Sequence, residues 1–253
     1  MLSLPDVLGW YLERMFDTQR RLTPLTRPIL QRVTGVPIAA DGVFDAVRRF
    51  YDRLDGVRDL LTDGDITSAR LVVNPERLVV AEARRTFTYL SLFGYHVDAV
   101  IANRLLPDAI ADPWFASWKG VQREHLDSIR AAFAPVPVIT ADLADHELVG
   151  VDHLSDFGAE LYGLHDAAAR LSLVDPFRVV VDGDALVLSM QLPFTDRTDV
   201  ELGRRNGELL VAVGAHRRAV VLPDSLRRRE VSEARMTDGR LEVEFVEVAH
   251  GDG

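Results

Sequence analysis

Apolar positions spaced three to four residues apart dominate the first quarter of the chain. Residues 3–21 carry them on one helical face, and Ser3 and Asp6 have the spacing of a capping box. Prolines interrupt residues 23–40, which we expect to be loop or broken helix. Residues 43–61 repeat the helical spacing and predict a second amphipathic helix. Either apolar stripe can be buried in the chain's own core or form a groove for a partner, and burial is the ordinary outcome.

Further along, short apolar runs alternate with helical patterns. The predicted strands cover residues 69–73, 97–106 and 136–139. Asn74 is expected to cap the first intervening helix, which Pro75 opens. Strands that alternate with helices predict right-handed crossovers and a parallel sheet, and ligands of such sheets bind beyond the C-terminal ends of the strands. Asn74, Asn103 and Asp142 stand at those ends, so they are candidate site residues.

In the last third of the chain, apolar and polar residues repeat with a different period. Apolar and polar residues alternate along 186–192 and 241–245, as in strands with one wet face. Pairs such as Asp182-Gly183 and Asp238-Gly239 are turn signals between such runs. We therefore predict an α/β fold with a partial parallel sheet over residues 1–162, a linker over 163–176, and a small all-β sandwich over 177–249. The 186–192 strand is the expected exposed edge of that sandwich.

Composition and charge restrict the classes of partner. The 253 residues are 47% hydrophobic and 27% charged, which is typical of a globular protein, and the net charge of −10 argues against nucleic acid as a partner. Arginine clusters such as Arg227-Arg228-Arg229 are expected to be part of a solvated surface of mixed charge. No apolar run approaches the roughly 18 residues that a membrane span needs, and no secretion leader is visible. We expect a cytoplasmic protein without a transmembrane segment.

The sequence lacks the residues that several kinds of catalytic site need. The chain has no cysteine, which excludes thiolate metal sites, and its one lysine, Lys119, is far from any glycine-rich loop. A phosphate-binding P-loop needs a lysine at the end of such a loop. His146 and His153 could share a helix face, where surface residues are more common than a metal pair. We predict no catalytic residue, and no metal ligand, within this sequence.

Several blocks nevertheless resemble one family when taken together in order. They are Leu2-Ser3-Leu4-Pro5-Asp6-Val7-Leu8-Gly9-Trp10-Tyr11-Leu12, Asn74-Pro75-Glu76, Leu92-Phe93-Gly94-Tyr95, Val100-Ile101-Ala102-Asn103-Arg104-Leu105-Leu106-Pro107 and Glu147-Leu148-Val149-Gly150. These blocks resemble ArsA-type ATPases, the P-loop NTPase family of arsenical pump-driving and tail-anchored-protein-targeting ATPases. Leu192-Pro193-Phe194 and Val221-Leu222-Pro223 resemble the small heat-shock-protein-like (α-crystallin-type) domain that closes many bacterial members.

The resemblance assigns roles to particular positions. It implies that Asn103, with Arg104 beside it, reads the adenine ring of ATP. It implies that the loop Asp142, Leu143 and Ala144 packs against the base, although the family usually has proline where Asp142 stands. Asn74 and Glu76 would lie on the dimer or switch side of the site.

The resemblance also implies what this chain would need. ATP and Mg would be the cofactors, but the family's phosphate and Mg ligands lie upstream of the first block. We therefore expect the C-terminal, truncated part of an ArsA-like ATPase, inactive in hydrolysis alone. A homodimer or an upstream ATPase half would be its partner, and a hydrophobic protein its client. A non-catalytic, chaperone-like binding module and a decayed product without function are the alternatives.

Overall fold

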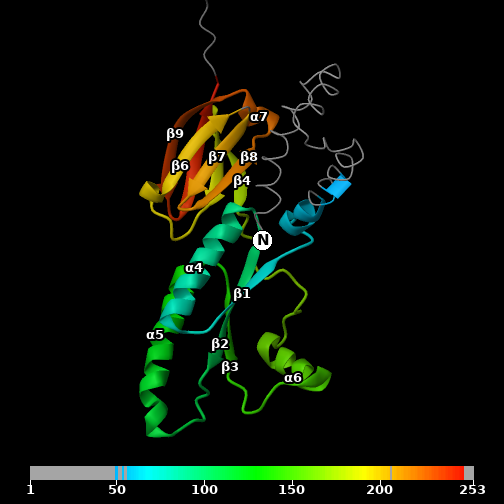
Figure 1. Cartoon of the computed structure of the whole chain (residues 1–253), viewed down its shortest axis with the longest axis vertical. Coiled ribbons are helices and arrows are strands. Elements are labelled where there is room, and N and C mark those ends of the chain that lie inside the picture. The colour runs from blue at the N-terminus through cyan, green and yellow to red at the C-terminus, as the bar shows by residue number, and fades with distance from the viewer. Residues whose placement is uncertain (1–48, 51–52, 54–55, 206, 248–253) are drawn as a thin grey trace, which may run out of the picture. The chain divides into compact units, whose positions relative to one another are not determined.

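The computed structural model describes residues 49–50, 53, 56–205 and 207–247 (Figure 1). Residues 56–62 are helical, in agreement with the predicted helix over 43–61, most of which lies outside the described residues. The expected helix over 3–21 and the proline-rich stretch over 23–40 also lie outside them.

Three parallel strands and three long helices form the first part of the described fold. The elements are β1 (Ala69–Val73), α4 (Arg77–Leu92), β2 (Val97–Leu105), the 3-10 turn η1 (Pro113–Phe115), α5 (Ala116–Phe133), β3 (Val138–Asp142) and α6 (Gly150–Tyr162). The sheet has the order β1-β2-β3, and both pairings are parallel. The predicted α/β pattern with a partial parallel sheet is therefore confirmed.

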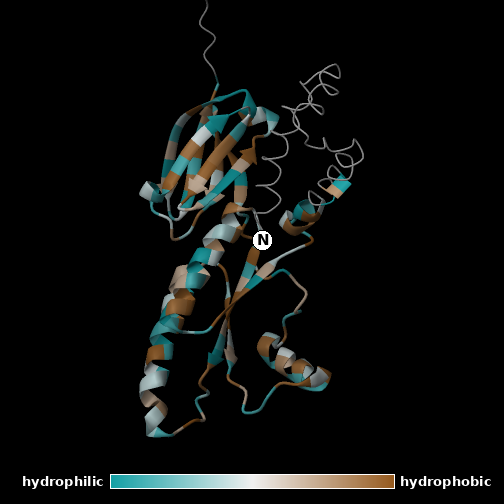
Figure 2. Cartoon of the chain, viewed as in Figure 1, coloured by the Kyte–Doolittle hydropathy of each residue, from teal (hydrophilic) through white to brown (hydrophobic). Residues whose placement is uncertain are grey.

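The core of this part lies between the sheet and one pair of helices. Strands β1 and β2 are rich in hydrophobic residues (Figure 2), and α4 and α5 cover one face of the sheet while α6 lies on the other (Figure 1). Ile129 and Phe133 of α5 are fully buried, and burial of side chains of this size stabilises a fold by about 1.5 to 3 kcal/mol each. Helix α6 has no buried residue, and Val151 on it is 83% exposed.

Two element boundaries differ from the sequence-based expectation. Helix α4 begins at Arg77 with Glu76 as its N-cap, so Asn74 does not cap it and Pro75 does not open it. The third strand begins at Val138 rather than at residue 136. Pro137 has no backbone N–H for a ladder hydrogen bond, and its carbonyl instead accepts from the Val100 amide at 2.9 Å. The regular pairing therefore starts at Val138, two residues later than predicted.

The stretch between α6 and the C-terminal part is fastened to the sheet by buried charge. Asp98 of β2 is 1% exposed and accepts hydrogen bonds from the Arg70 guanidinium at 3.2 and 3.1 Å. It also accepts from the Leu171 amide at 3.1 Å. Arg70 in turn donates to the carbonyls of Ala167 and Ala169, at 2.6 and 2.7 Å. This connecting stretch therefore follows a fixed path at the N-terminal ends of β1 and β2.

The C-terminal part consists of two antiparallel sheets. Its strands are β4 (Phe177–Asp182), β5 (Ala185–Gln191), β6 (Val200–Arg205), β7 (Glu208–Val213), β8 (His216–Val221), β9 (Glu230–Thr237) and β10 (Arg240–Val246), with the turn η2 (Arg197–Asp199) and the short α7 (Asp224–Arg227). Buried Met190, Val243 and Phe245 come from one sheet, and Leu209 and Val211 from the other. The predicted β-sandwich is confirmed.

One strand of the sandwich does not have the expected position. The four-stranded sheet has the order β4-β5-β10-β9, and the second sheet has the order β6-β7-β8. The strand predicted as the exposed edge, residues 186–192, corresponds to β5 and pairs with strands on both sides. Alternation in the sequence shows that one face of a strand is wet, but it does not show whether its backbone is paired. The edges of the two sheets are β4, β9, β6 and β8.

The sandwich packs directly on the helices of the α/β part. The Thr88 hydroxyl of α4 donates to the Pro193 carbonyl at 2.6 Å. The Phe194 ring lies 6.3 Å from the Phe87 ring and 5.5 Å from the Phe133 ring, measured between centroids. Arg218 donates to the Leu92 carbonyl at the C-terminal end of α4. The sandwich is thus anchored by apolar and polar contacts as well as by the chain connection.

Candidate functional site

The three predicted site positions meet at one edge of the parallel sheet. Val73 of β1 pairs with Ala102 of β2, which pairs with Thr140 of β3. Asn74, Asn103 and Asp142 follow these paired residues by one or two positions, so they line the same C-terminal edge. The side chains of Asn74 and Asn103 are half-buried, while Asp142 is exposed.

The backbone at the predicted base-reading pair is irregular. Ala102 pairs with Thr140, and the next pair along the ladder is Leu105 with Asp142. Two residues of β2, Asn103 and Arg104, therefore stand opposite one residue of β3, as in a β-bulge. Arg104 has a φ of 60°, a left-handed conformation that costs a non-glycine residue about 1 to 2 kcal/mol. Bulges of this kind turn a side chain away from its regular direction and are common beside functional sites.

Hydrogen bonds from two other elements hold the residues after this bulge. The Gln122 side-chain amide on α5 donates to the Arg104 carbonyl at 3.1 Å and accepts from the Leu106 amide at 2.8 Å. The Leu105 carbonyl accepts from the Leu143 amide at 2.7 Å. The predicted base-packing loop is thus joined by a backbone hydrogen bond to Leu105, the residue that follows the predicted base-reading pair. Sequence reasoning missed Gln122, because a glutamine in Val121-Gln122-Arg123-Glu124 has the pattern of an ordinary helix surface.

The remaining predicted positions lie beside this group. Leu143 is 38% exposed, so its apolar side chain is accessible at the same edge. Glu76 is exposed, and its amide donates to the Asn74 carbonyl at 2.7 Å in the turn that leads into α4. The strand edge of β1 next to this turn is unpaired in the described sheet.

This edge carries side-chain amides and one accessible apolar side chain. A side-chain amide such as that of Asn103 offers both a donor and an acceptor to a purine edge. The Lys119 ammonium donates to the Asp108 carbonyl at 3.1 Å and lies 4.0 Å from the Asp108 carboxylate, so it is already engaged away from any glycine turn. Among the described residues, no three acidic or histidine side chains are grouped to hold a metal ion. The rings of His146 and His153 meet edge to face, with centroids 4.8 Å apart, and no third ligand completes a metal site there among the described residues.

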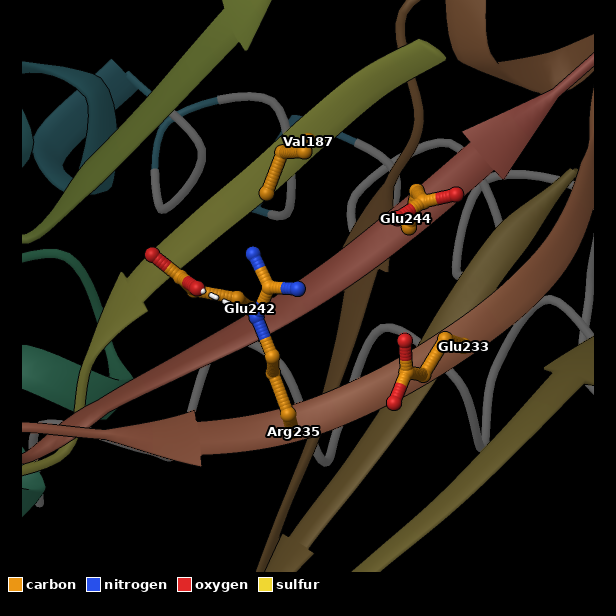
Figure 3. A pocket seen from close by; sticks show the side chains of 5 residues that line it. All are labelled: Val187, Glu233, Arg235, Glu242 and Glu244. Atoms are coloured by element: carbon orange, nitrogen blue, oxygen red, sulfur yellow. Dashed lines mark hydrogen bonds and ion pairs between the residues drawn. The ribbon is translucent and has the colours of Figure 1, made fainter. Parts of the chain in front are cut away.

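Two hollows lie away from this edge, on the sandwich. One is a shallow dip on the outer face of β5, β10 and β9, where Arg235 reaches Glu242 at 2.9 Å (Figure 3). The hydrogen bond that Arg235 donates to the Glu242 carboxylate raises the pKa of Arg235, and the nearby carboxylates of Glu233 and Glu244 add smaller effects of the same sign. One ion pair, between Arg235 and Glu242, therefore joins neighbouring strands in this dip, and the Glu244 carboxylate accepts instead from the Ser232 hydroxyl at 2.9 Å.

A second hollow lies between the two sheets at their unpaired edges. It has a volume of about 150 Å³, and its walls come from β6, β9, β10 and the turn η2. The lining residues are Arg197, Val200, Leu202, Ala234, Arg235, Met236 and Leu241. An apolar slot between two strand edges can accept an extended peptide, because the edges supply backbone donors and acceptors.

Comparisons with known proteins agree with both parts of the fold. A family model described as anion-transporting ATPase matches residues 1–163, and one described as the HSP20-like domain found in ArsA matches residues 183–245. A putative arsenical pump-driving ATPase of Aquifex aeolicus is 32% identical over 239 residues, which is 93% of this chain and 60% of that protein. Protein Rv2184c of Mycobacterium tuberculosis is 33% identical over 97% of this chain and 60% of its own length.

A plant relative matches a smaller share of the chain. The ATPase GET3B of Arabidopsis thaliana is 29% identical over 161 residues, which is 62% of this chain and 39% of that protein.

The chain spans about 60% of the length of the two bacterial relatives named above. In the described residues, no helix is both long enough and apolar enough to cross a membrane.

Proposed function

The chain belongs to the ArsA-type family of anion-transporting ATPases, and from this premise we propose that it forms the base-binding wall of an ATP site. The observation that carries the proposal is the bulge at Asn103 and Arg104, tied to the loop at Leu143 by the hydrogen bond to the Leu105 carbonyl. Asn103, Arg104 and Leu143 are positions for which the family resemblance implies contact with the base.

Each group has a role that its chemistry supports. The Asn103 amide would pair with the amino group and a neighbouring ring nitrogen of adenine, because it is both donor and acceptor. Leu143 would give the ring an apolar surface, with Asp142 and Ala144 as its neighbours in the loop. Arg104, which is exposed, would lie at the open side of the base.

The phosphates and Mg would be held by a partner segment. In the sheet formed by the described residues, strand β1 has one unpaired edge, and Val72 and Leu78 beside it are 59% and 78% exposed. An edge strand with apolar neighbours is a template for pairing with another strand. We propose that an ATPase half carrying the glycine-rich loop pairs there, so that Asn74 and Glu76 face the phosphate side. Such a half would supply the charge neutralisation that phosphoryl transfer needs, and a homodimer is the other assembly to test.

Replacing Asn103 by alanine tests the base-binding wall. Adenosine is the probe, because it presents the base without phosphates. In NMR titrations of the whole chain, Asn103→Ala is expected to weaken adenosine binding by about tenfold and to remove the preference for adenosine over guanosine, since two hydrogen bonds are lost. Glu124→Gln, an exposed change on α5, is the control and should bind as the wild type does. Equal binding by Asn103→Ala and wild type would refute the proposal.

The hollow between β6 and β9 supports a second candidate function. We propose that it takes extended apolar segments of client proteins, as a chaperone-like module would, without ATP. Leu202 is 37% exposed at this hollow, and Leu241 at its floor is buried, so apolar surface is available to a guest. Clients would be recognised by alternate apolar side chains and by backbone pairing with a strand edge.

A charge placed in that hollow tests the second function. Leu202→Glu is expected to reduce, about fivefold or more, the ability of the chain to suppress aggregation of an unfolding client protein, because it puts a carboxylate on an apolar guest site. Glu201→Gln is a matched control on the same strand, at an exposed residue that does not line the hollow. Equal suppression by Leu202→Glu and wild type, measured by light scattering without nucleotide, would exclude the hollow as the client site.

A further inference from the structure

The Gln122 side chain makes an unusual pair of contacts. It reaches from α5 to β2 and uses both ends of its amide on one short piece of backbone. Its nitrogen donates to the Arg104 carbonyl at 3.1 Å, and its oxygen accepts from the Leu106 amide at 2.8 Å. The side chain therefore brackets Leu105, the residue at which regular pairing with β3 resumes.

The helix that carries Gln122 is a fixed support. The C-terminal half of α5 is anchored by Ile129 and Phe133, which are fully buried. At its other end, the Asp112 carboxylate accepts from the Trp114 amide at 2.8 Å and caps the turn that leads into the helix. An amide held on such a helix can impose a position on the strand that it contacts.

The contacted backbone needs that support. Arg104 has a φ of 60°, a region that non-glycine residues rarely occupy unless the surroundings hold them there. The ladder between β2 and β3 is interrupted between Ala102 and Leu105, so the sheet does not fix this residue. Among the described hydrogen bonds, the one from Gln122 is the contact made by the Arg104 carbonyl.

We propose that Gln122 is the positioning residue of the base site: it holds the bulge in the shape that presents Asn103 to adenine. This inference rests on the function proposed above and adds a residue that does not touch the nucleotide. It predicts that the base preference, and not only the fold, depends on an amide 18 residues from Arg104 in the sequence.

Substitution of Gln122 by leucine, glutamate or asparagine alters the two hydrogen bonds of the amide in different ways. Leucine removes both hydrogen bonds while keeping a similar volume. Glutamate can still accept from the Leu106 amide, but its second oxygen would face the Arg104 carbonyl, and two acceptors repel each other. Asparagine has both groups on a side chain that is one methylene shorter, so it cannot bridge the same distance.

The test combines hydrogen exchange with adenosine binding on the whole chain. Gln122→Leu is expected to speed exchange of the Leu106 amide about tenfold and to weaken adenosine binding about fivefold to tenfold, because two hydrogen bonds are lost. Gln122→Glu should keep the Leu106 amide protected and still weaken adenosine binding. Glu124→Gln is the control and should change neither quantity.

The outcomes distinguish this inference from the function on which it rests. If wild type binds adenosine and Gln122→Leu binds it equally well, Gln122 does not position the base site, whatever happens to Leu106. Unchanged Leu106 exchange in Gln122→Leu would also overturn the inference, because the hydrogen bond would then be unimportant. If wild type does not bind adenosine, the proposed function fails and the inference falls with it. If Gln122→Leu does not fold, Gln122→Glu decides by the same binding measurement.

Discussion

Replacing Asp98 by alanine is expected to lower the free energy of unfolding of the Asp63–Gly253 unit by about 3 to 5 kcal/mol, because it leaves the Arg70 guanidinium without its buried partner. The Asp98 side chain is fully buried and that of Arg70 is 17% exposed. The Leu171 amide would lose its acceptor as well. Denaturant unfolding followed by circular dichroism measures the change.

A control in the same connecting stretch separates burial from charge. Asp175 pairs with Arg170 at 3.3 Å, but its side chain is 57% exposed. Asp175→Ala is therefore expected to cost about 1 kcal/mol or less, as exposed ion pairs do. Equal losses for Asp98→Ala and Asp175→Ala would contradict the assignment of Asp98 as the buried anchor of this stretch.

The same carboxylate makes stability depend on pH. Burial alone would raise the pKa of Asp98, but hydrogen bonds from Arg70, the Leu171 amide and Ser68 outweigh it, so the pKa lies below the usual value. A group whose pKa is lowered on folding stabilises the protein above its unfolded pKa of about 3.9. That contribution is lost as pH falls through the lower, folded value. The difference in stability between wild type and Asp98→Asn should therefore be constant above about pH 5 and shrink in more acidic solution.

The sequence predicted the regular parts of the fold because their patterns are local. The apolar run at 69–73 became β1 residue for residue, and α4 ends at Leu92, close to Gly94, which has a φ of 83°. The two periods, alternating and helical, separated the sandwich from the α/β part. These features follow from side-chain spacing and from the backbone conformation that glycine permits.

The features that were missed depend on contacts between distant residues. Asp98 looked like one polar interruption in an apolar strand, and its partners Arg70 and Leu171 are 28 and 73 residues away. β5 was expected at an edge and is internal, because strand order is a tertiary property. The bulge at Asn103 and Arg104 could not be predicted, since it is visible only as a shift in register with β3. The base-reading role came from the family resemblance and not from local pattern, and it stays a prediction.

If a partner holds the phosphates, as proposed, the affinity of this chain for ATP should be far below that of a complete P-loop site. In a complete P-loop site, backbone amides, a lysine and Mg bind the phosphates, so ATP binds far more tightly than adenosine. The one lysine of this chain is engaged with Asp108. The contacts that we propose at Asn103 and Leu143 are to the base. We therefore expect ATP hydrolysis by this chain alone to be undetectable, and phosphates to add nothing to binding.

The ratio of adenosine to ATP affinity most directly tests the proposal that this chain contacts the base and not the phosphates. Both ligands should be titrated into the whole chain, with Mg present, and followed at the amide resonances of Asn103 and Leu143. We expect the dissociation constants of adenosine and ATP to agree within about threefold, since the base that both ligands share provides the contacts. ATP binding a hundredfold or more tighter than adenosine, or turnover of ATP by the chain alone, would contradict the claim that this chain holds the base and leaves the phosphates to a partner.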